Sequence, residues 1–263
     1  MALWSVALSV LTASALVVRW CQAQPRQKPP GEAWHKLPLS LIHQVRRWLC
    51  TVAVVATMIW SWMTLSNIQF CNSTGSSCIA FAGWLQFSSF TRWCWLLQGA
   101  YFVFASLVDT GALRCTRLVH LMFQVSFSFA CFVTVVTYTV LVPGALLVGV
   151  PKAQQGNVEL LLSPQGHIMH SLNSVFMFVE ARALGPAVVV ELADFKWGIS
   201  LGVTFLVFEW WFYATTGIWH YPFLDVNKPS PLPEIAHVLL LSAFFGFWSL
   251  GAVITNGSRL HFD

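Results

Sequence analysis

The chain has 263 residues, of which 57% are hydrophobic and 9% are charged, and its formal net charge is +4. Soluble domains carry about 25% charged residues, and a globule of this length cannot hide so much apolar surface from water. This composition excludes an ordinary soluble protein, and the small net charge gives no reason to expect a nucleic-acid partner. We therefore expect an integral membrane protein whose main partner is membrane lipid.

Residues 1–20 form an apolar segment without a basic leader, and Cys21-Gln22-Ala23 follows it as a passable cleavage site. The segment is a signal peptide, an interfacial helix or an additional N-terminal span. Cleavage would leave the basic residues of the stretch 21–44 on the translocated side, contrary to the positive-inside rule. We therefore expect the segment to be retained and residues 21–44 to form a cytoplasmic linker.

Six further segments are apolar over roughly the 20 residues that a membrane span needs. They are residues 48–65, 93–112, 118–142, 167–184, 197–218 and 235–254. The fourth is the least apolar, because it carries two histidines, Asn173, Glu180 and Arg182. The sequence predicts an all-α integral membrane bundle of six transmembrane helices within residues 45–257, followed by a cytoplasmic tail at 258–263.

The distribution of Lys and Arg orients this bundle. With the linker in the cytoplasm, only Arg92, Lys152 and Lys228 of the 14 basic residues lie on the opposite side. Such a bias in short loops predicts a cytoplasmic C-terminus. We expect the membrane to be that of the endoplasmic reticulum or the plasma membrane.

The loop between the first two spans contains the glycosylation sequon Asn72-Ser73-Thr74, flanked by Cys71 and Cys78. Glycosylation and disulfide formation both require the lumen or the exterior, which is where the orientation places this loop. We expect a glycan on Asn72 and a disulfide between Cys71 and Cys78. The alternative is a pair of free thiols.

His167, His170 and Asn173 follow one another at three-residue steps, which places them on one face of a helix. Strongly polar groups inside a membrane span are costly and therefore indicate a functional site. The orientation puts this stripe near the lumenal or exterior surface, so a site there would open toward that side. Further polar or aromatic residues at the same level are Thr91, Gln98, Trp219, His220, Tyr221 and His237.

Three motifs follow one another along the chain: Phe90-Thr-Arg-Trp-Cys-Trp-Leu-Leu-Gln98-Gly-Ala-Tyr-Phe102, Gly166-His-Ile-Met-His170-Ser-Leu-Asn173 and Thr216-Gly-Ile-Trp-His-Tyr-Pro-Phe-Leu-Asp225. Together they resemble the androgen-induced and rolling-stone family of multi-span membrane proteins, over residues 91–254. The androgen-induced branch consists of threonine hydrolases that cleave esters between fatty acids and hydroxy fatty acids. The resemblance implies an acyl-lipid substrate, no cofactor, Thr91 as nucleophile and His170 as general base.

A threonine hydroxyl becomes a good nucleophile only beside a base, and imidazole suits that role near neutral pH. Acyl transfer also needs donors for the developing oxyanion. The available donors are Asn173, Gln98, Trp219 and Tyr221, with His167 as a supporting residue. Arg92 stands where the family usually has an apolar residue, and it either binds a fatty-acid carboxylate or extends to lipid phosphate.

Other interpretations stay open at this point. Thr91 also suits the N-cap of the second span, and His170 suits a hydrogen bond that only stabilises helix packing. A zinc-dependent lipid hydrolase would bind its metal through His167, His170, His220 and His237. A non-enzymatic protein of the rolling-stone type would serve cell fusion or adhesion. A transporter is a weaker alternative, because the spans show no internal repeat.

Overall fold

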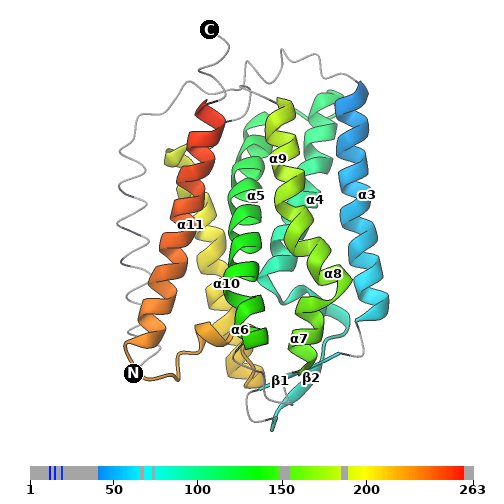
Figure 1. The fold of residues 1–263 in the computed structure, drawn as a ribbon. Coiled ribbons are helices and arrows are strands. Elements are labelled where there is room, and N and C mark those ends of the chain that lie inside the picture. Colours follow the sequence, from blue (N-terminus) through cyan, green and yellow to red (C-terminus); the bar gives the residue numbers. More distant parts are fainter. Residues whose placement is uncertain are drawn as a thin grey trace.

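The computed structural model describes residues 41–65, 68–72, 75–147, 155–184 and 189–257, together with positions 12, 15 and 19. The described chain is a bundle of long helices with one small two-stranded sheet (Figure 1). The predictions for the N-terminal segment, for the linker up to residue 40 and for the tail fall outside these ranges, except at the three isolated positions.

Helices make up nearly all of the bundle. They are α3 (Leu41–Thr64), α4 (Phe90–Asp109), α5 (Thr116–Val136), α6 (Val142–Leu147), α7 (Gln155–Leu162), α8 (Pro164–His167), α9 (Asn173–Leu184), α10 (Phe195–Thr216) and α11 (Leu232–Gly257). Two wide π turns, η2 (Thr137–Leu141) and η4 (Ile168–Leu172), join α5 to α6 and α8 to α9. Three short 3-10 helices are η1 (Gly83–Phe87), η6 (Leu192–Asp194) and η7 (Pro222–Leu224).

The long helices lie side by side and alternate in direction (Figure 1). One end of the bundle carries the strands β1 (Gln69–Cys71) and β2 (Cys78–Ala80) together with α7, and we name it the hairpin end. The opposite end carries the start of α3 and the ends of α9 and α11. We name it the basic end, because Arg46, Arg47 and Arg182 lie at these helix termini.

Two helical stretches are long and apolar enough to cross a membrane, judged by length and composition: Thr116–Leu146 and Leu232–Thr255. Three of the other predicted spans lie in α3, α4 and α10, which contain more Trp and charged residues than these two stretches. The fourth predicted span lies in α8, η4 and α9. The helical class is confirmed, and membrane association is supported by these two helices. α3 begins at Leu41 and includes Arg46 and Arg47 in its first turns. The predicted start of the membrane domain at residue 45 stays a prediction.

The first helix of the bundle buries its polar side. Arg47, Thr51, Thr57 and Ser61 of α3 are buried, whereas large apolar residues such as Leu49 are exposed. The hydroxyls of Thr51 and Thr57 each donate to the carbonyl oxygen four residues earlier, so no water is needed to satisfy them. An apolar outer face with small polar residues inside is typical of helices that pack within lipid.

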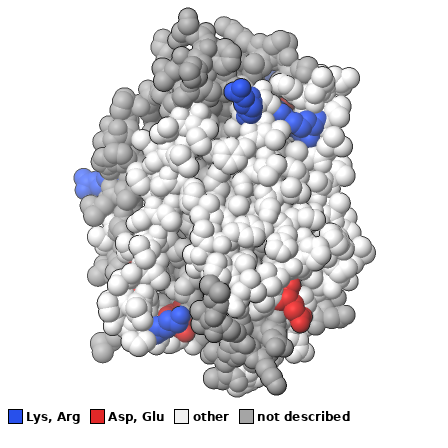
Figure 2. All heavy atoms as spheres, viewed as in Figure 1, with Lys and Arg blue, Asp and Glu red and all other residues white. Residues whose placement is uncertain are grey.

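The charged side chains lie near the two ends of the bundle. On the face shown in Figure 2, the middle of the described surface is almost free of Lys, Arg, Asp and Glu. At the basic end, Arg47 pairs with both Asp109 and Glu180, and Arg46 also pairs with Glu180. Asp109 points into the bundle, toward α3.

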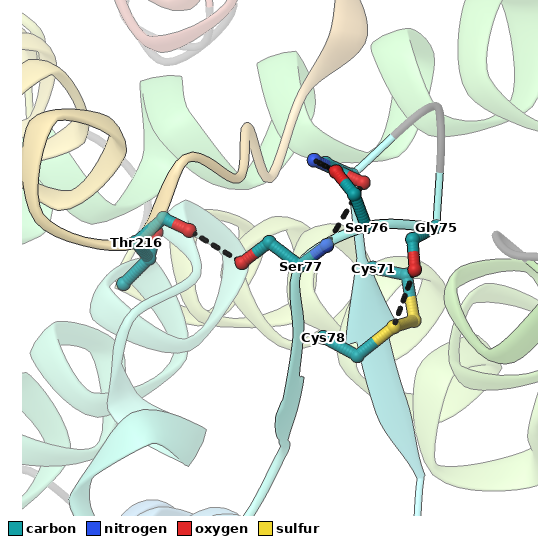
Figure 3. The surroundings of a disulfide bond; sticks show 7 residues. Cys71, Gly75, Ser76, Ser77, Cys78 and Thr216 are labelled. Atoms are coloured by element: carbon teal, nitrogen blue, oxygen red, sulfur yellow. Dashed lines mark hydrogen bonds between the residues drawn. A yellow bond between two sulfur atoms is a disulfide. The ribbon is translucent and has the colours of Figure 1, made fainter.

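The hairpin closes the other end. Its two strands pair antiparallel, with Cys71 opposite Cys78, and these residues form the predicted disulfide (Figure 3). Ser77 Oγ donates to the carbonyl oxygen of Thr216, 2.8 Å away, and so attaches the hairpin to the end of α10. Asn72 is partly exposed beside the turn. Its glycosylation stays a prediction, since Ser73 and Thr74 lie outside the described residues.

Candidate functional site

The structure brings Thr91 and His170 together. Thr91 Oγ1 lies 3.1 Å from His170 Nε2, although 79 residues separate them along the chain. Both side chains are buried, with 8% and 7% of their surface exposed. The N-cap of α4 is Ser89, so the interpretation of Thr91 as the cap was wrong. A hydroxyl within hydrogen-bond reach of an imidazole nitrogen is the arrangement that a nucleophile and its base require.

His170 reaches this position from the wide turn η4. A π turn inserts an extra residue into a helix and is frequent at functional sites. The second ring nitrogen, Nδ1, has no hydrogen bond of standard geometry within the described part of the chain. The backbone carbonyl of Gly166 interacts with the ring. The ring is therefore oriented by backbone and packing, and no carboxylate of the described residues holds it.

A cavity of about 110 Å³ borders Thr91. Its walls are almost entirely apolar and come from α4, α5, η2, α10, α11 and the segment 221–224 that includes part of η7. Lining residues include Phe90, Thr91, Phe129, Phe205, Tyr221 and Phe244. A narrow apolar cavity beside a nucleophile suits a hydrocarbon chain better than a polar substrate.

Tyr221 is the oxyanion-donor candidate that lies at the pair. Its phenol oxygen accepts the backbone N–H of Phe90 at 3.1 Å and interacts with the side chain and backbone of Thr91. Burial raises the pKa of the Tyr221 phenol, so the group stays protonated at neutral pH. A protonated phenol beside the nucleophile can donate to the oxygen of a carbonyl under attack.

Tyr221→Phe should lower kcat for ester hydrolysis by about 10²-fold and leave KM nearly unchanged, because the lost hydrogen bond forms in the transition state. Tyr213→Phe is the matched control. Its phenol bonds to Asn227 at 2.8 Å, and its ring does not line the cavity. Steady-state kinetics of both variants would check the assignment, which fails if the two variants retain equal activity.

The remaining donor candidates lie away from Thr91. Gln98 Nε2 donates to the backbone oxygen of Asn173 at 3.2 Å, and neither residue lines the cavity. The amide of Asn173 is buried without a hydrogen bond inside the described ranges. Trp219 stacks on Tyr213 with ring centroids 4.3 Å apart and also lies outside the cavity lining. His167 is exposed and bonded to Tyr138 at 2.9 Å.

Arg92 points to neither lipid phosphate nor the cavity. Its guanidinium is buried, donates to Gln86 Oε1 at 2.8 Å and to the hydroxyl of Ser61, and lies over the ring of Phe81 at 4.8 Å. The group connects η1 and α3 to the start of α4. Extension to the membrane surface, one of the two predicted roles, was therefore wrong, because the side chain turns into the bundle.

The four histidines proposed for zinc do not form a group of metal ligands. His237 Nδ1 bonds to the carbonyl of Pro233 at 2.7 Å, and His220 is occupied by Glu209. Among the described residues, the group that meets ligand spacing is His120, Glu191 and Asp194, at the basic end. Arg117 already donates two hydrogen bonds to Asp194, at 2.5 and 2.7 Å, and supplies the positive charge there.

One constellation was missed in the sequence. Ser88 Oγ lies 2.6 Å from His220 Nε2, and His220 Nδ1 lies 2.8 Å from Glu209 Oε2. Ser88 and Glu209 were not among the residues predicted for the site. The signal in the sequence was Glu209 itself, because an acidic residue inside an apolar span requires a polar partner.

Comparisons with protein-family models, with curated proteins and with solved structures find no match to this chain. The fold and the site define a helical protein that has two helices long and apolar enough to cross a membrane, and a buried hydroxyl–imidazole pair beside an apolar cavity. The resemblance to the androgen-induced and rolling-stone family stays a prediction.

Proposed function

We propose that this protein spans a membrane with six helical segments and hydrolyses an acyl-lipid ester at Thr91 and His170. The helical segments of the proposal are α3, α4, α5 to α6, α8 to α9, α10 and α11. Exposed apolar residues on α3, α10 and α11, together with charges gathered at both ends, support six crossings. The basic end would face the cytoplasm, and the hairpin end would face the lumen or exterior.

The observation that carries the activity is the 3.1 Å contact between Thr91 Oγ1 and His170 Nε2 at the wall of the apolar cavity. The acyl chain would occupy the cavity, which places its carbonyl carbon next to the hydroxyl. A purely structural pair would need no empty apolar space beside it, because protein interiors are otherwise close-packed.

In the proposed reaction, Thr91 Oγ1 bonds to the ester carbonyl carbon while its proton passes to His170 Nε2. Tyr221 donates a hydrogen bond to the carbonyl oxygen as negative charge develops there. The ester C–O bond then breaks, and the departing alkoxide takes the proton from His170 and leaves as an alcohol. Water attacks the acyl-threonine, His170 accepts its proton, and the fatty acid leaves as Thr91 regains its hydroxyl hydrogen.

An alkyl fluorophosphonate tests the nucleophile directly in the full-length protein. Chymotryptic cleavage after Phe87, Phe90 and Trp93 would give a peptide that contains Thr91 and Arg92 but no serine. We expect an adduct on this peptide, loss of the adduct in Thr91→Ala, and its retention in Thr91→Ser. Thr137→Ala is the matched control, since Thr137 lines the same cavity without an imidazole hydrogen bond. Undiminished ester hydrolysis in Thr91→Ala would exclude the proposal.

A further inference from the structure

Three side chains at the hairpin end have the order of a serine-hydrolase triad. His220 lies between Ser88, 2.6 Å from its Nε2, and Glu209, 2.8 Å from its Nδ1. All three residues are buried. When Nδ1 is bound to a carboxylate, Nε2 is left free to accept a proton from a hydroxyl, which is the arrangement that activates serine.

The carboxylate of Glu209 is bound through both of its oxygens. Glu209 Oε1 accepts the backbone N–H of His220 at 2.7 Å, so both carboxylate oxygens are bound by the same residue. Among the described residues, no Lys or Arg forms a salt bridge with Glu209. A buried carboxylate without a permanent cation is costly. The imidazolium that forms during acyl transfer would supply the missing positive charge.

Ser88 stands between the end of η1 and the N-terminus of α4. Backbone N–H groups at a helix N-terminus lack intrahelical partners and stabilise nearby negative charge. The Ser88 hydroxyl also has the carbonyl oxygen of Leu85 as a second acceptor. The Ser88 hydroxyl can therefore donate to His220 Nε2 when that nitrogen is unprotonated, and to the Leu85 carbonyl oxygen when His220 is protonated.

We propose that Ser88, His220 and Glu209 form a second hydrolytic centre for apolar acyl esters. It shares neither the nucleophile nor the base with Thr91 and His170, so each centre can exist without the other. The substrate class follows from the surroundings, because the ring of Phe212 lies 4.2 Å from the His220 ring and the nearby Phe70 and Ile218 are apolar.

The reaction balances with water as the only co-reactant. Ser88 Oγ bonds to the ester carbonyl carbon, and its proton moves to His220 Nε2. The C–O bond to the leaving group breaks, and the alkoxide takes that proton. Water then attacks the acyl-serine and gives a proton to His220, which returns it to Ser88 Oγ as the carboxylic acid departs. Glu209 stays ionised and orients the ring throughout.

The hairpin controls access to this centre. Phe70 of β1 lies 5.6 Å from the His220 ring and stacks on Phe81, with ring centroids 5.1 Å apart. The disulfide ties the two strands together, and Ser77 fastens them to the end of α10 through Thr216 (Figure 3). An ester would reach Ser88 when the hairpin lifts from α10, as lids do in other enzymes.

The fluorophosphonate experiment separates the two centres. Chymotryptic cleavage after Phe87 and Phe90 places Ser88 and Ser89 on one peptide and Thr91 on the next. We expect a second adduct on the Ser88 peptide, located by fragmentation at Ser88. Ser88→Ala should abolish it. The neighbouring Ser89→Ala is the matched control and should leave it within about 2-fold, because the Ser89 side chain makes no capping hydrogen bond.

Glu209→Gln distinguishes a catalytic arrangement from a structural one. The glutamine side chain has the same shape as glutamate, but its amide holds the His220 imidazole in the wrong tautomer. We expect modification of Ser88 to slow by about 10⁴-fold, with thermal unfolding by tryptophan fluorescence confirming a folded variant. Ser77→Ala should accelerate modification of Ser88 severalfold and leave Thr91 unaffected.

The possible outcomes are distinct for the two proposals. An adduct on Thr91 alone, or an unchanged rate at Ser88 in Glu209→Gln, overturns the second centre and leaves the Thr91 proposal standing. An adduct on Ser88 alone, lost in Ser88→Ala, establishes the second centre and removes the first. Absence of both adducts overturns both.

Discussion

In a Ser88→Ala background, His170→Ala should lower kcat for hydrolysis of an acyl-lipid ester by about 10³-fold, because the variant removes the base that takes the proton of Thr91. The background removes the second proposed centre, which would hydrolyse esters on its own. The imidazole contacts the nucleophile at 3.1 Å. Substrate affinity should change little, since the apolar cavity is built from other side chains. Steady-state kinetics in detergent or in lipid vesicles would separate the two effects.

His167→Ala is the control for this experiment. His167 lies one turn before His170 but is exposed and bonded to Tyr138, outside the pair. Its removal should change kcat by less than about 2-fold. Equal losses of kcat in His170→Ala and His167→Ala would mean that both histidines stabilise the fold of this helix and that neither acts as the base. Addition of imidazole to His170→Ala should restore part of the activity if the missing group is a base.

The three-residue steps of His167, His170 and Asn173 predicted one helical face, and this prediction was only partly right. His170 and Asn173 are buried, whereas His167 is exposed. The reason is η4, because a π turn breaks the regular spacing between the residues before it and those after it. Nothing in local residue propensity indicates such a turn.

The closeness of Thr91 and His170 was predictable in part, because both residues lie near the starts of helical segments that run in the same direction, from the hairpin end to the basic end, and so at a similar depth. Their assignment as nucleophile and base came from the family resemblance. Depth follows from the order of apolar segments and from their orientation. The rotation of each helix about its axis does not follow from depth. The sequence therefore could not show that Tyr221, rather than Gln98 or Trp219, is the donor beside Thr91. Rotation depends on packing across several helices at once.

The Ser88 constellation was hidden for a different reason. Ser88 and His220 are 132 residues apart, and the segment between η1 and α4 and the loop after α10 bring them together. Serine before an apolar run is common at helix starts, so Phe87-Ser-Ser-Phe90 predicts only the beginning of α4. The contacts of Arg92 could not be predicted for the same reason, since its partners Gln86 and Ser61 come from a 3-10 helix and from α3.

Glu180→Ala should lower the free energy of unfolding by about 3–5 kcal/mol, because it removes a buried carboxylate that pairs with the buried Arg47 and the partly buried Arg46. Glu180 accepts hydrogen bonds from Arg46, from Arg47 at 2.7 Å and from Tyr101 at 2.8 Å. These contacts join α3, α4 and α9 at the basic end. Breaking one partner of a buried pair costs more than the pair itself contributes, since the remaining charge stays desolvated.

Denaturation in detergent micelles, followed by tryptophan fluorescence, would measure this effect. Glu180→Gln should cost less than Glu180→Ala, because the amide oxygen still accepts a hydrogen bond from Tyr101 or an arginine. Glu159→Gln on α7 is the control: Glu159 is exposed, so its change should stay within about 0.5 kcal/mol. A loss below about 1 kcal/mol in Glu180→Ala would mean that water or lipid headgroups reach the arginines. The basic end would then be open to the membrane surface, and α3 would be held mainly by its close contact with α4, where Gly99 faces Val54.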